Sequence, residues 1–311
     1  MSKSYHITTG DIDGIGLEIS LKALKKVSPK IKKENFFIWC HYSQKKIVLS
    51  FLKKHSSLNK SSQFINNFSV SKTFLKFNFI LNSDNTPAHW FTEAVKDCIL
   101  NKSSVITAPL SKTQIKAEGL NDVGHTEILK RMTDTTNLKM CFFGKYFSII
   151  LFTDHIPINK IKITEVPFVK FLKSCKQLHF KFKNKKSNIH VLGLNPHAGD
   201  SGIIGNEDAS ILRWARSILD VEKLIPADSA FVNFKKFKHS PTFISLYHDQ
   251  GLIPFKMAHG YNGYHYTMGL PFVRTSVDHG TAKDIFGKNS ADFQSMTDAI
   301  LAAIKLSKNK S

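Results

Sequence analysis

The chain has 311 residues, 42% of them hydrophobic and 22% charged, a composition typical of a globular protein large enough for two lobes. It contains no run of about 18 apolar residues, and Met1–Ile7 lacks the apolar region of a signal peptide, so we expect a cytoplasmic protein with no membrane partner. The four cysteines are widely spaced and form no CxxC pair. This spacing argues against a zinc finger or a disulfide framework and predicts reduced core thiols.

The formal net charge of +20 raises nucleic acid as a partner, because basic charge attracts polyanions. Only four of the 44 basic residues are arginine, however, and guanidinium is the favoured group for paired contacts to phosphates and bases. The lysines are scattered, with the densest block between Lys22 and Lys54. This distribution favours a solvated lysine-rich surface, so we expect no nucleic-acid partner.

The first element is a short apolar strand at Tyr5–Thr9, which runs into a glycine-rich turn at Gly10–Gly16 and then into a helix at Leu17–Val27. A strand, a glycine turn and a helix in this order indicate an α/β unit. The spacing is GxxxGxG, which differs from the GxGxxG of a Rossmann fingerprint. A plain tight turn and a ligand-binding loop both remain open here.

The rest of the chain alternates between apolar runs and helical spacing. Strands are expected at Phe36–Cys40, Ser104–Ala108, Met140–Phe143, Phe147–Phe152, Ile189–Leu194 and Thr242–Leu246, with the third and fourth forming an antiparallel pair. Helices are expected at Gln44–Lys54, Ala88–Leu100, from Gly124 onward, Val166–Phe180, Glu207–Leu219 and Ala291–Leu306. Weak periodicity between Lys60 and Thr86 predicts a variable edge or loop. The alternation predicts an α/β protein with a mostly parallel sheet and polar motifs at the strand ends.

The stretch Leu246–Lys288 concentrates glycines, His-Asp pairs and cations between short apolar bursts, so we expect functional loops there. Within it, Lys256 and Arg274 stand among apolar residues, where an unpaired charge is costly. A bound phosphate or carboxylate would satisfy them, and so would an internal salt bridge.

Three histidines, His155, His197 and His248, each follow an apolar strand-like run. Imidazoles at equivalent strand ends can meet at one sheet edge and bind a divalent metal. Single histidines at strand ends are more often structural, and from the residues alone the two interpretations are about equal. Likewise, Gly124–Glu127 fits an ordinary helix start, with Thr126 as N-cap, as well as it fits a binding motif.

Five motifs occur in order: TAPLSK at Thr107–Lys112, GHTE at Gly124–Glu127, GLNPHAGD at Gly193–Asp200, YHDQGL at Tyr247–Leu252 and GLPFVRTSVDHGTA at Gly269–Ala282. With these motifs the sequence resembles the 4-hydroxythreonine-4-phosphate dehydrogenases, NAD-dependent enzymes of vitamin B6 biosynthesis. The resemblance covers the first strand and turn and the chain from about Ala88 to its C-terminus.

The resemblance implies a two-lobed α/β/α fold like that of isocitrate and isopropylmalate dehydrogenases, with an active-site cleft between the lobes. Residues 1–120 and 255–311 would form one lobe, and residues 121–254 a second lobe that carries the metal ligands and the dimer contact. It also implies a homodimer with a metal site shared between subunits. The reaction would be the oxidation and decarboxylation of 4-phosphooxy-L-threonine to 3-amino-2-oxopropyl phosphate, with NAD and a divalent cation such as zinc, magnesium or cobalt.

The resemblance also assigns roles to residues. The metal ligands would be His155, His197 and His248, and the substrate-binding residues would be His125, Thr126, Lys256, His265 and Arg274. The cofactor loop, similar to the adenosine-binding loop of the β-decarboxylating dehydrogenases, would comprise Asp278, His279, Gly280, Thr281 and Ala282. Asp249 and Lys256 are the candidates for the group that removes the hydroxyl proton, and Asp249 could instead orient a metal ligand.

One position departs from the family pattern, because His265 stands where the family commonly has asparagine. Imidazole titrates near neutral pH, unlike an amide. A paralogous dehydrogenase of threonate or erythronate 4-phosphate therefore remains an alternative. A metal-dependent hydrolase without NAD is another, from a different enzyme class.

Overall fold

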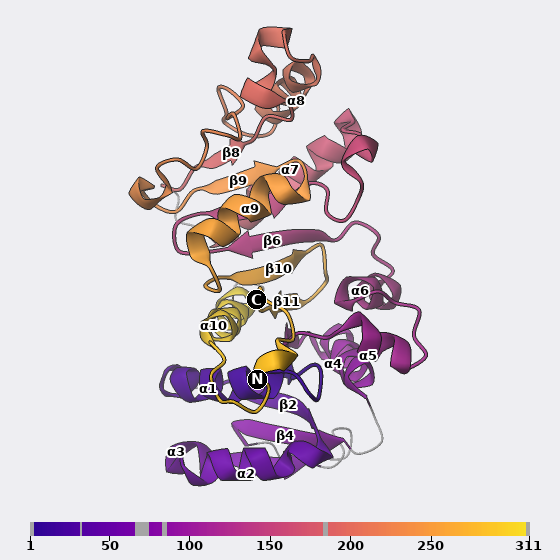
Figure 1. Cartoon of the computed structure of the whole chain (residues 1–311), viewed down its shortest axis with the longest axis vertical. Helices are drawn as coiled ribbons and strands as arrows, with labels where there is room; N and C mark the ends of the chain where they lie inside the picture. Colours follow the sequence, from indigo (N-terminus) through magenta and orange to yellow (C-terminus); the bar gives the residue numbers. More distant parts are fainter. Residues whose placement is uncertain (1–2, 32, 66–74, 83–85, 183–185, 309–311) are drawn as a thin grey trace. The chain divides into compact units, whose positions relative to one another are not determined.

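The computed structural model describes residues 3–31, 33–65, 75–82, 86–182 and 186–308, and Figure 1 labels most of their helices and several of their strands. The chain divides into two compact units, Met1–Leu138 with Tyr264–Ser311 and Lys139–Gly263. These boundaries lie later in the chain than the expected ones, after residues 120 and 254. The segment with His125 and Thr126 consequently belongs to the first unit, where its neighbours Ile128 and Leu129 are part of the hydrophobic core.

The described strands of the first unit follow the order β3-β4-β2-β1-β5-β11-β10. They are β1 (Ser4–Thr8), β2 (Asn35–His41), β3 (Ser62–Ile65), β4 (Phe77–Asn82), β5 (Ser104–Thr107), β10 (Tyr264–Met268) and β11 (Val273–Ser276). The neighbours pair in parallel, except that β10 and β11 are antiparallel. The mostly parallel sheet expected from the alternating pattern is confirmed.

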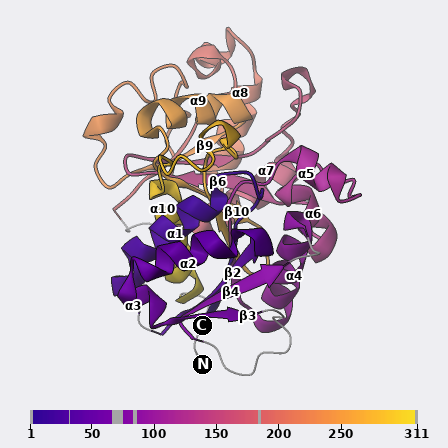
Figure 2. The ribbon, with the colours of Figure 1, turned by 60° about the horizontal axis from the view of Figure 1, so that its bottom comes forward.

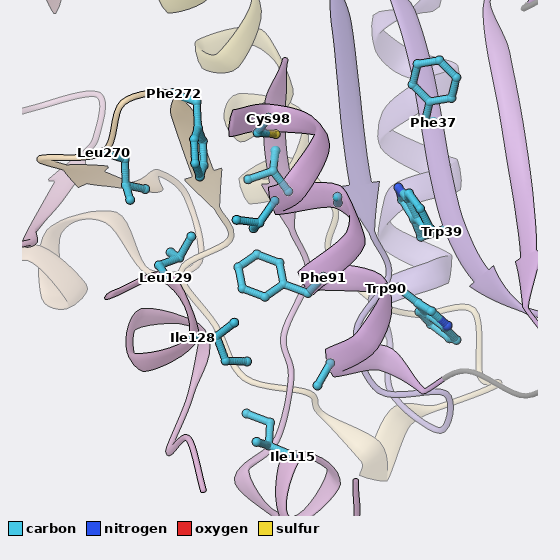
Figure 3. Close-up of a cluster of buried hydrophobic side chains, with 14 of the residues drawn as sticks. Phe37, Trp39, Trp90, Phe91, Cys98, Ile115, Ile128, Leu129, Leu270 and Phe272 are labelled. Carbon is cyan, nitrogen blue, oxygen red and sulfur yellow. The ribbon is translucent and has the colours of Figure 1, made fainter. Parts of the chain in front are cut away.

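The helices of this unit are α1 (Gly16–Val27), α2 (Lys45–Lys53), α3 (Ser56–Asn59), α4 (Pro87–Asn101), α5 (Lys112–Ala117), α6 (His125–Thr133) and α10 (Gln294–Lys308). A core cluster joins α4, α5 and α6 to the sheet, and Figure 3 shows Phe91 of α4 between Trp90 and the α6 side chains Ile128 and Leu129. α1 packs against α10. Helices in contact with a parallel sheet are what βαβ crossovers produce.

The second unit contains the strand order β6-β7-β9-β8 within its described residues. Its elements are β6 (Lys139–Phe143), β7 (Ser148–Leu151), α7 (Glu165–Phe182), β8 (Ile189–Val191), α8 (Glu207–Arg216), β9 (Thr242–Ser245) and α9 (His248–His259). The expected antiparallel pair is present as β6 and β7, while β7, β9 and β8 run parallel. Phe147 lies at the centre of its core and contacts the rings of Phe243 and Phe255.

One expectation about local structure was wrong, and another was right only in part. The stretch Leu246–Lys288 is not mainly loop, since it forms α9, β10 and β11. α9 was not predicted because glycine and proline, here Gly251 and Pro254, are uncommon inside helices. Gly251 is required by close packing, since a Cβ there would stand 2.6 Å from side-chain atoms of Ile149 and Ser245. The segment at 60–86, expected as a variable edge or loop, contains β3 at the edge of the sheet and β4 beside it, and residues 66–74 and 83–85 lie outside the described part. β4 is buried on both faces, so its sequence shows no alternation.

Among the described residues, no helix is long and apolar enough to cross a membrane.

Candidate functional site

Three motifs meet at one edge of the first unit's sheet. β1, β5 and β11 are parallel neighbours, so the turn after β1, the loop after β5 and the loop after β11 leave the sheet on the same side. Asp11 N–H donates to the Pro109 carbonyl at 3.2 Å, and Ile15 N–H donates to the Thr281 carbonyl at 3.1 Å. The three loops therefore form one connected layer of backbone.

Two glycines of the first turn are required by close packing. Gly10 has a φ of +68°, and a Cβ on it would stand 1.9 Å from the Pro109 carbonyl oxygen. A Cβ on Gly16 would stand 1.8 Å from the Thr9 carbonyl oxygen. Because any side chain would collide with backbone atoms, these glycines have a structural role whether or not the turn also meets a ligand.

Arg274 is a buried cation whose hydrogen-bond partners are neutral side chains. It lies on β11 with 4% of its surface exposed, and it donates to Thr107 Oγ1 at 2.8 Å, to Thr267 Oγ1 at 2.9 Å and to His265 Nδ1 at 3.0 Å. Burial lowers the pKa of its guanidinium to about 9. None of these partners is negatively charged, and within the described residues no carboxylate pairs with it, so the internal salt bridge considered above is absent there.

His265 lies on β10, buried and directly opposite Ser276 of β11. Its Nδ1 is 3.0 Å from both Arg274 Nη1 and Ser276 Oγ. A guanidinium can only donate, so Nδ1 must accept and the ring proton must be on Nε2. The geometry thus corresponds to a neutral imidazole that binds the arginine.

His125 and Thr126 open α6, whose N-cap is Gly124. The expectation that Thr126 is the N-cap was therefore wrong. The His125 ring packs edge-on against Phe91 at 4.6 Å between centroids. Burial and the charge of Arg274 lower the pKa of His125 well below its usual value, so this imidazole is neutral at pH 7 and the arginine is close enough to affect it.

The expected cofactor loop follows β11. Asp278 is buried, and its N–H donates to Ser295 Oγ at 3.1 Å, which anchors the start of the loop to α10. Gly280 has open space around its Cα, with nothing within 4 Å of where a Cβ would stand. Lys283, directly after the loop, binds Asp11 at 3.1 Å and Asp13 at 2.8 Å and so joins this loop to the glycine turn.

The three candidate metal ligands follow parallel strands of the second unit. His155 comes after β7, His197 lies after β8, and His248 is the first residue of α9 after β9. The structure brings two of them together, with the rings of His155 and His248 5.4 Å apart between centroids. Among the described residues of a single chain, no group of three or more His, Cys, Asp or Glu side chains is arranged to hold a metal ion.

His197 belongs to a strained loop. The backbone from His197 to Ser201 has positive φ throughout, which is unfavourable for residues other than glycine. Asp208, buried in the first turn of α8, accepts hydrogen bonds from the N–H groups of Leu194 at 2.6 Å and Asn195 at 3.1 Å. These bonds fix the start of the loop, a feature that the sequence did not reveal.

Asp249 and Lys256 both project from α9, where a spacing of seven residues places them on the same face. Asp249 Oδ1 is 2.7 Å from His248 Nδ1. Because this contact occupies Nδ1, Nε2 is the ring nitrogen that could bind a metal ion. Lys256 is exposed, so the expectation that it is embedded among apolar residues was wrong. The apolar neighbours Leu252 and Phe255 face the core while Lys256 points away from it.

Sequence reasoning missed two neutral partners of Arg274, Thr107 and Thr267, and it missed Ser276, the partner of His265. Thr107 was visible as the first residue of the TAPLSK motif. Thr267 carried no signal, because a threonine in a strand is ordinary.

Comparison with known proteins decides the family. A family model described as "Pyridoxal phosphate biosynthetic protein PdxA" matches residues 82–303. The chain belongs to this family. It is accordingly an oxidoreductase, as are the curated relatives named 4-hydroxythreonine-4-phosphate dehydrogenase. Those from Sulfurihydrogenibium sp. and Aquifex aeolicus are 34% and 33% identical, each over 96% of this chain and 97% of the relative.

Solved structures extend the likeness to the fold. A 4-hydroxythreonine-4-phosphate dehydrogenase from Klebsiella pneumoniae matches with a TM-score of 0.74 at 26% identity, over 99% of this chain and 98% of that one. An isocitrate dehydrogenase from Methylococcus capsulatus matches with a TM-score of 0.54 at 12% identity, over 99% of this chain and 88% of that one. The isocitrate dehydrogenase-like fold expected for this PdxA family member is thereby confirmed.

Proposed function

We propose that the chain oxidises and decarboxylates 4-phosphooxy-L-threonine to 3-amino-2-oxopropyl phosphate, with NAD and a divalent cation, as a cytoplasmic homodimer. The family membership supports the reaction class. The observation that carries the substrate assignment is Arg274, a buried cation bound only by neutral side chains among the described residues. Burying a charge without an opposite charge is costly, and an anionic substrate group supplies that opposite charge.

In this proposal Arg274, His125 and Thr126 hold the anionic and polar groups of the substrate, together with Lys256 and His265. His125 is neutral, so it can donate one hydrogen bond and accept another without repelling the arginine. The loop of Asp278 to Ala282 would hold NAD, which would supply the hydride acceptor for C3 of the substrate, and the open space at Gly280 would allow a cofactor to approach the backbone.

The proton of the C3 hydroxyl passes from its oxygen to a base, for which Asp249 and Lys256 are the candidates. The C–C bond to the carboxylate then breaks, CO₂ departs, and the electron pair passes to the carbon next to the new ketone, which takes up a proton. Both candidates lie on the same face of α9 as described above. Their exposure in a single chain fits a base that meets the substrate at the surface of the subunit.

The chemistry of the donor set fits a divalent cation. His155 and His248 present neighbouring imidazoles, and the Asp249 contact orients His248, a pattern that supports metal ligands in many proteins. A cation bound to His155, His197 and His248 would withdraw charge from the reacting oxygen. The proposed cation is a divalent metal ion such as zinc, magnesium or cobalt.

Exposed apolar side chains support the dimer. Each of the three histidine segments carries some: Ile156 and Ile158 after His155, Ile203 and Ile204 after His197, and Ile253 and Met257 after His248. Of these, Ile203 and Met257 are 82% and 83% exposed. Large apolar side chains at such positions are typical of a protein interface, and ligands from a second subunit would complete the metal set.

The test is NADH formation by the purified protein, followed by its absorbance, with 4-phosphooxy-L-threonine and added divalent metal. Signal that a chelator abolishes and that metal restores would support the proposal. NADH formation with threonate or erythronate 4-phosphate, and none with 4-phosphooxy-L-threonine, would support the proposed site but change the substrate assignment. Metal-dependent phosphate release without NADH would overturn the dehydrogenase assignment in favour of a hydrolase.

A further inference from the structure

The first unit contains an open pocket of about 640 Å³ that none of the proposed substrate, metal or cofactor residues lines, although Gly14 of the glycine turn borders it. It lies between α1, α2 and the segment from Phe286 to Asn289, and Figure 2 shows the two helices next to each other. A pocket of this size suits a small molecule. Its walls therefore show what class of molecule it would accept.

The floor of the pocket is apolar. Leu17 and Leu21 of α1 form it with Ile47 and Phe51 of α2, and Phe286 also lines the pocket. Ile47 and Phe286 are 49% and 43% exposed, so their surfaces are available for contact. Aromatic and branched side chains around a gap favour a flat apolar body.

The rim of the pocket is strongly basic. It carries Lys22, Lys25, Lys46 and Lys54, whereas Glu18 is the sole acidic residue in the lining. Glu18 already binds Lys22 at 2.7 Å. Within the described residues, Lys25, Lys46 and Lys54 form no ion pair, so their charges face the pocket uncompensated.

His55 lies among these lysines at the edge of the pocket. It lines the pocket with its ring edge-on to Phe51, 4.6 Å between centroids. Its pKa is lowered by burial and by the charges of Lys25 and Lys54. An anion placed between these lysines would relieve their mutual repulsion.

We propose that this pocket is a second ligand site, separate from the candidate active site, for a small molecule with a flat apolar body and a phosphate, sulfonate or carboxylate group. The apolar floor receives the body, and Lys25, Lys46 and Lys54 bind the anionic group. Lysine suits this task because it contacts an anion as a point charge without demanding one geometry.

The probe for the test is 8-anilinonaphthalene-1-sulfonate, which has an aromatic body and one anionic group and fluoresces when bound. The full-length protein should bind it saturably. The triple variant Lys25→Ala, Lys46→Ala, Lys54→Ala should bind it about tenfold or more weakly, which corresponds to about 1.4 kcal/mol. The uncharged analogue N-phenyl-1-naphthylamine should bind both proteins equally.

Two controls separate the pocket from general effects. The triple variant Lys235→Ala, Lys236→Ala, Lys238→Ala removes the same charge from exposed positions of the other unit and should leave probe binding unchanged. Ile47→Asn alters the floor at a half-exposed position, where folding should survive, and should weaken both probes.

Equal binding of the sulfonate probe by the wild type and the first triple variant would overturn the proposal. An equal loss in the two triple variants would overturn it as well, because net charge alone would then explain the affinity. None of these measurements depends on turnover, so they stand apart from the proposed dehydrogenase activity.

Discussion

The guanidinium of Arg274 donates from Nη1 to His265 Nδ1 at 3.0 Å, across two adjacent antiparallel strands. Both side chains are buried, so neither can exchange this partner for bulk water. The contact fixes the neutral tautomer of the histidine and one end of the arginine fork. Substrate recognition in this chain should therefore depend on both residues.

Replacing Arg274 with lysine should raise KM for the phosphorylated substrate about 10- to 100-fold, because charge-assisted hydrogen bonds contribute about 1.5–3 kcal/mol. Lysine retains the charge but cannot form the planar fork. Steady-state kinetics would measure the effect, with thermal unfolding as a control for folding. An unchanged KM would show that Arg274 does not contact the substrate.

His265→Asn and His265→Leu should behave differently. Asparagine offers a carbonyl oxygen that can accept from Arg274, so its KM should stay within a few-fold of the wild type. Leucine removes the acceptor and leaves a buried donor unsatisfied, at a cost of about 1–3 kcal/mol. KM should then rise about tenfold. Equal kinetics for the two variants would contradict the acceptor role.

Asp249→Asn should weaken metal binding about 10- to 100-fold while leaving the fold intact, because residues that orient a metal-bound histidine typically contribute this much. Equilibrium dialysis with zinc or cobalt would measure the affinity directly. The matched control is Asp292→Asn, an exposed carboxylate of the other unit. Loss of turnover with normal metal affinity would instead favour Asp249 as the base.

Gly16→Ala and Gly280→Ala provide a contrast between a structural and a ligand-facing glycine. At Gly16 the new Cβ would collide with the Thr9 backbone, and the free energy of unfolding should fall by about 3 kcal/mol. At Gly280 the Cβ would meet open space, so stability should be unchanged. If the loop binds NAD, the affinity for NAD should nevertheless fall, and normal NAD binding by Gly280→Ala would argue against this loop.

The free energy of unfolding should depend on the ionisation of Asp97 at acid pH. Burial opposes ionisation of this carboxyl, but hydrogen bonds, first from His6 Nε2 at 2.7 Å, lower its pKa from 3.8 to about 2. Because the pKa of Asp97 is lower in the folded than in the unfolded chain, ionised Asp97 stabilises the fold at pH values above its unfolded pKa of 3.8. This stabilisation is lost as the pH falls toward 2. Asp97→Asn should therefore lower the free energy of unfolding by about 2 kcal/mol at pH 7, and urea unfolding should show this difference shrinking below pH 4.

The sequence predicted those parts of the fold that have a simple pattern. The β1 turn, the β6–β7 pair and the polar motifs after β5, β7, β8 and β9 were all readable, because apolar runs followed by glycine and polar residues mark strand ends. α9 was missed because glycine and proline occur inside it, and β4 was missed because both its faces are buried.

The site was less predictable because local context does not determine burial. Lys256 and Arg274 have similar apolar neighbours in the sequence, yet only Arg274 is buried. A helix can turn one residue outward from a core that its neighbours face, whereas a central strand covered on both faces cannot. The threonine partners of Arg274 come from strands far apart in the sequence, and nothing local marks them.

The most direct test of the proposed reaction is the ratio of CO₂ released to NADH formed by the metal-loaded protein acting on 4-phosphooxy-L-threonine. Oxidation followed by decarboxylation requires one CO₂ for each NADH, and both should disappear together when a chelator is added. NADH without CO₂, or CO₂ without NADH, would contradict the account.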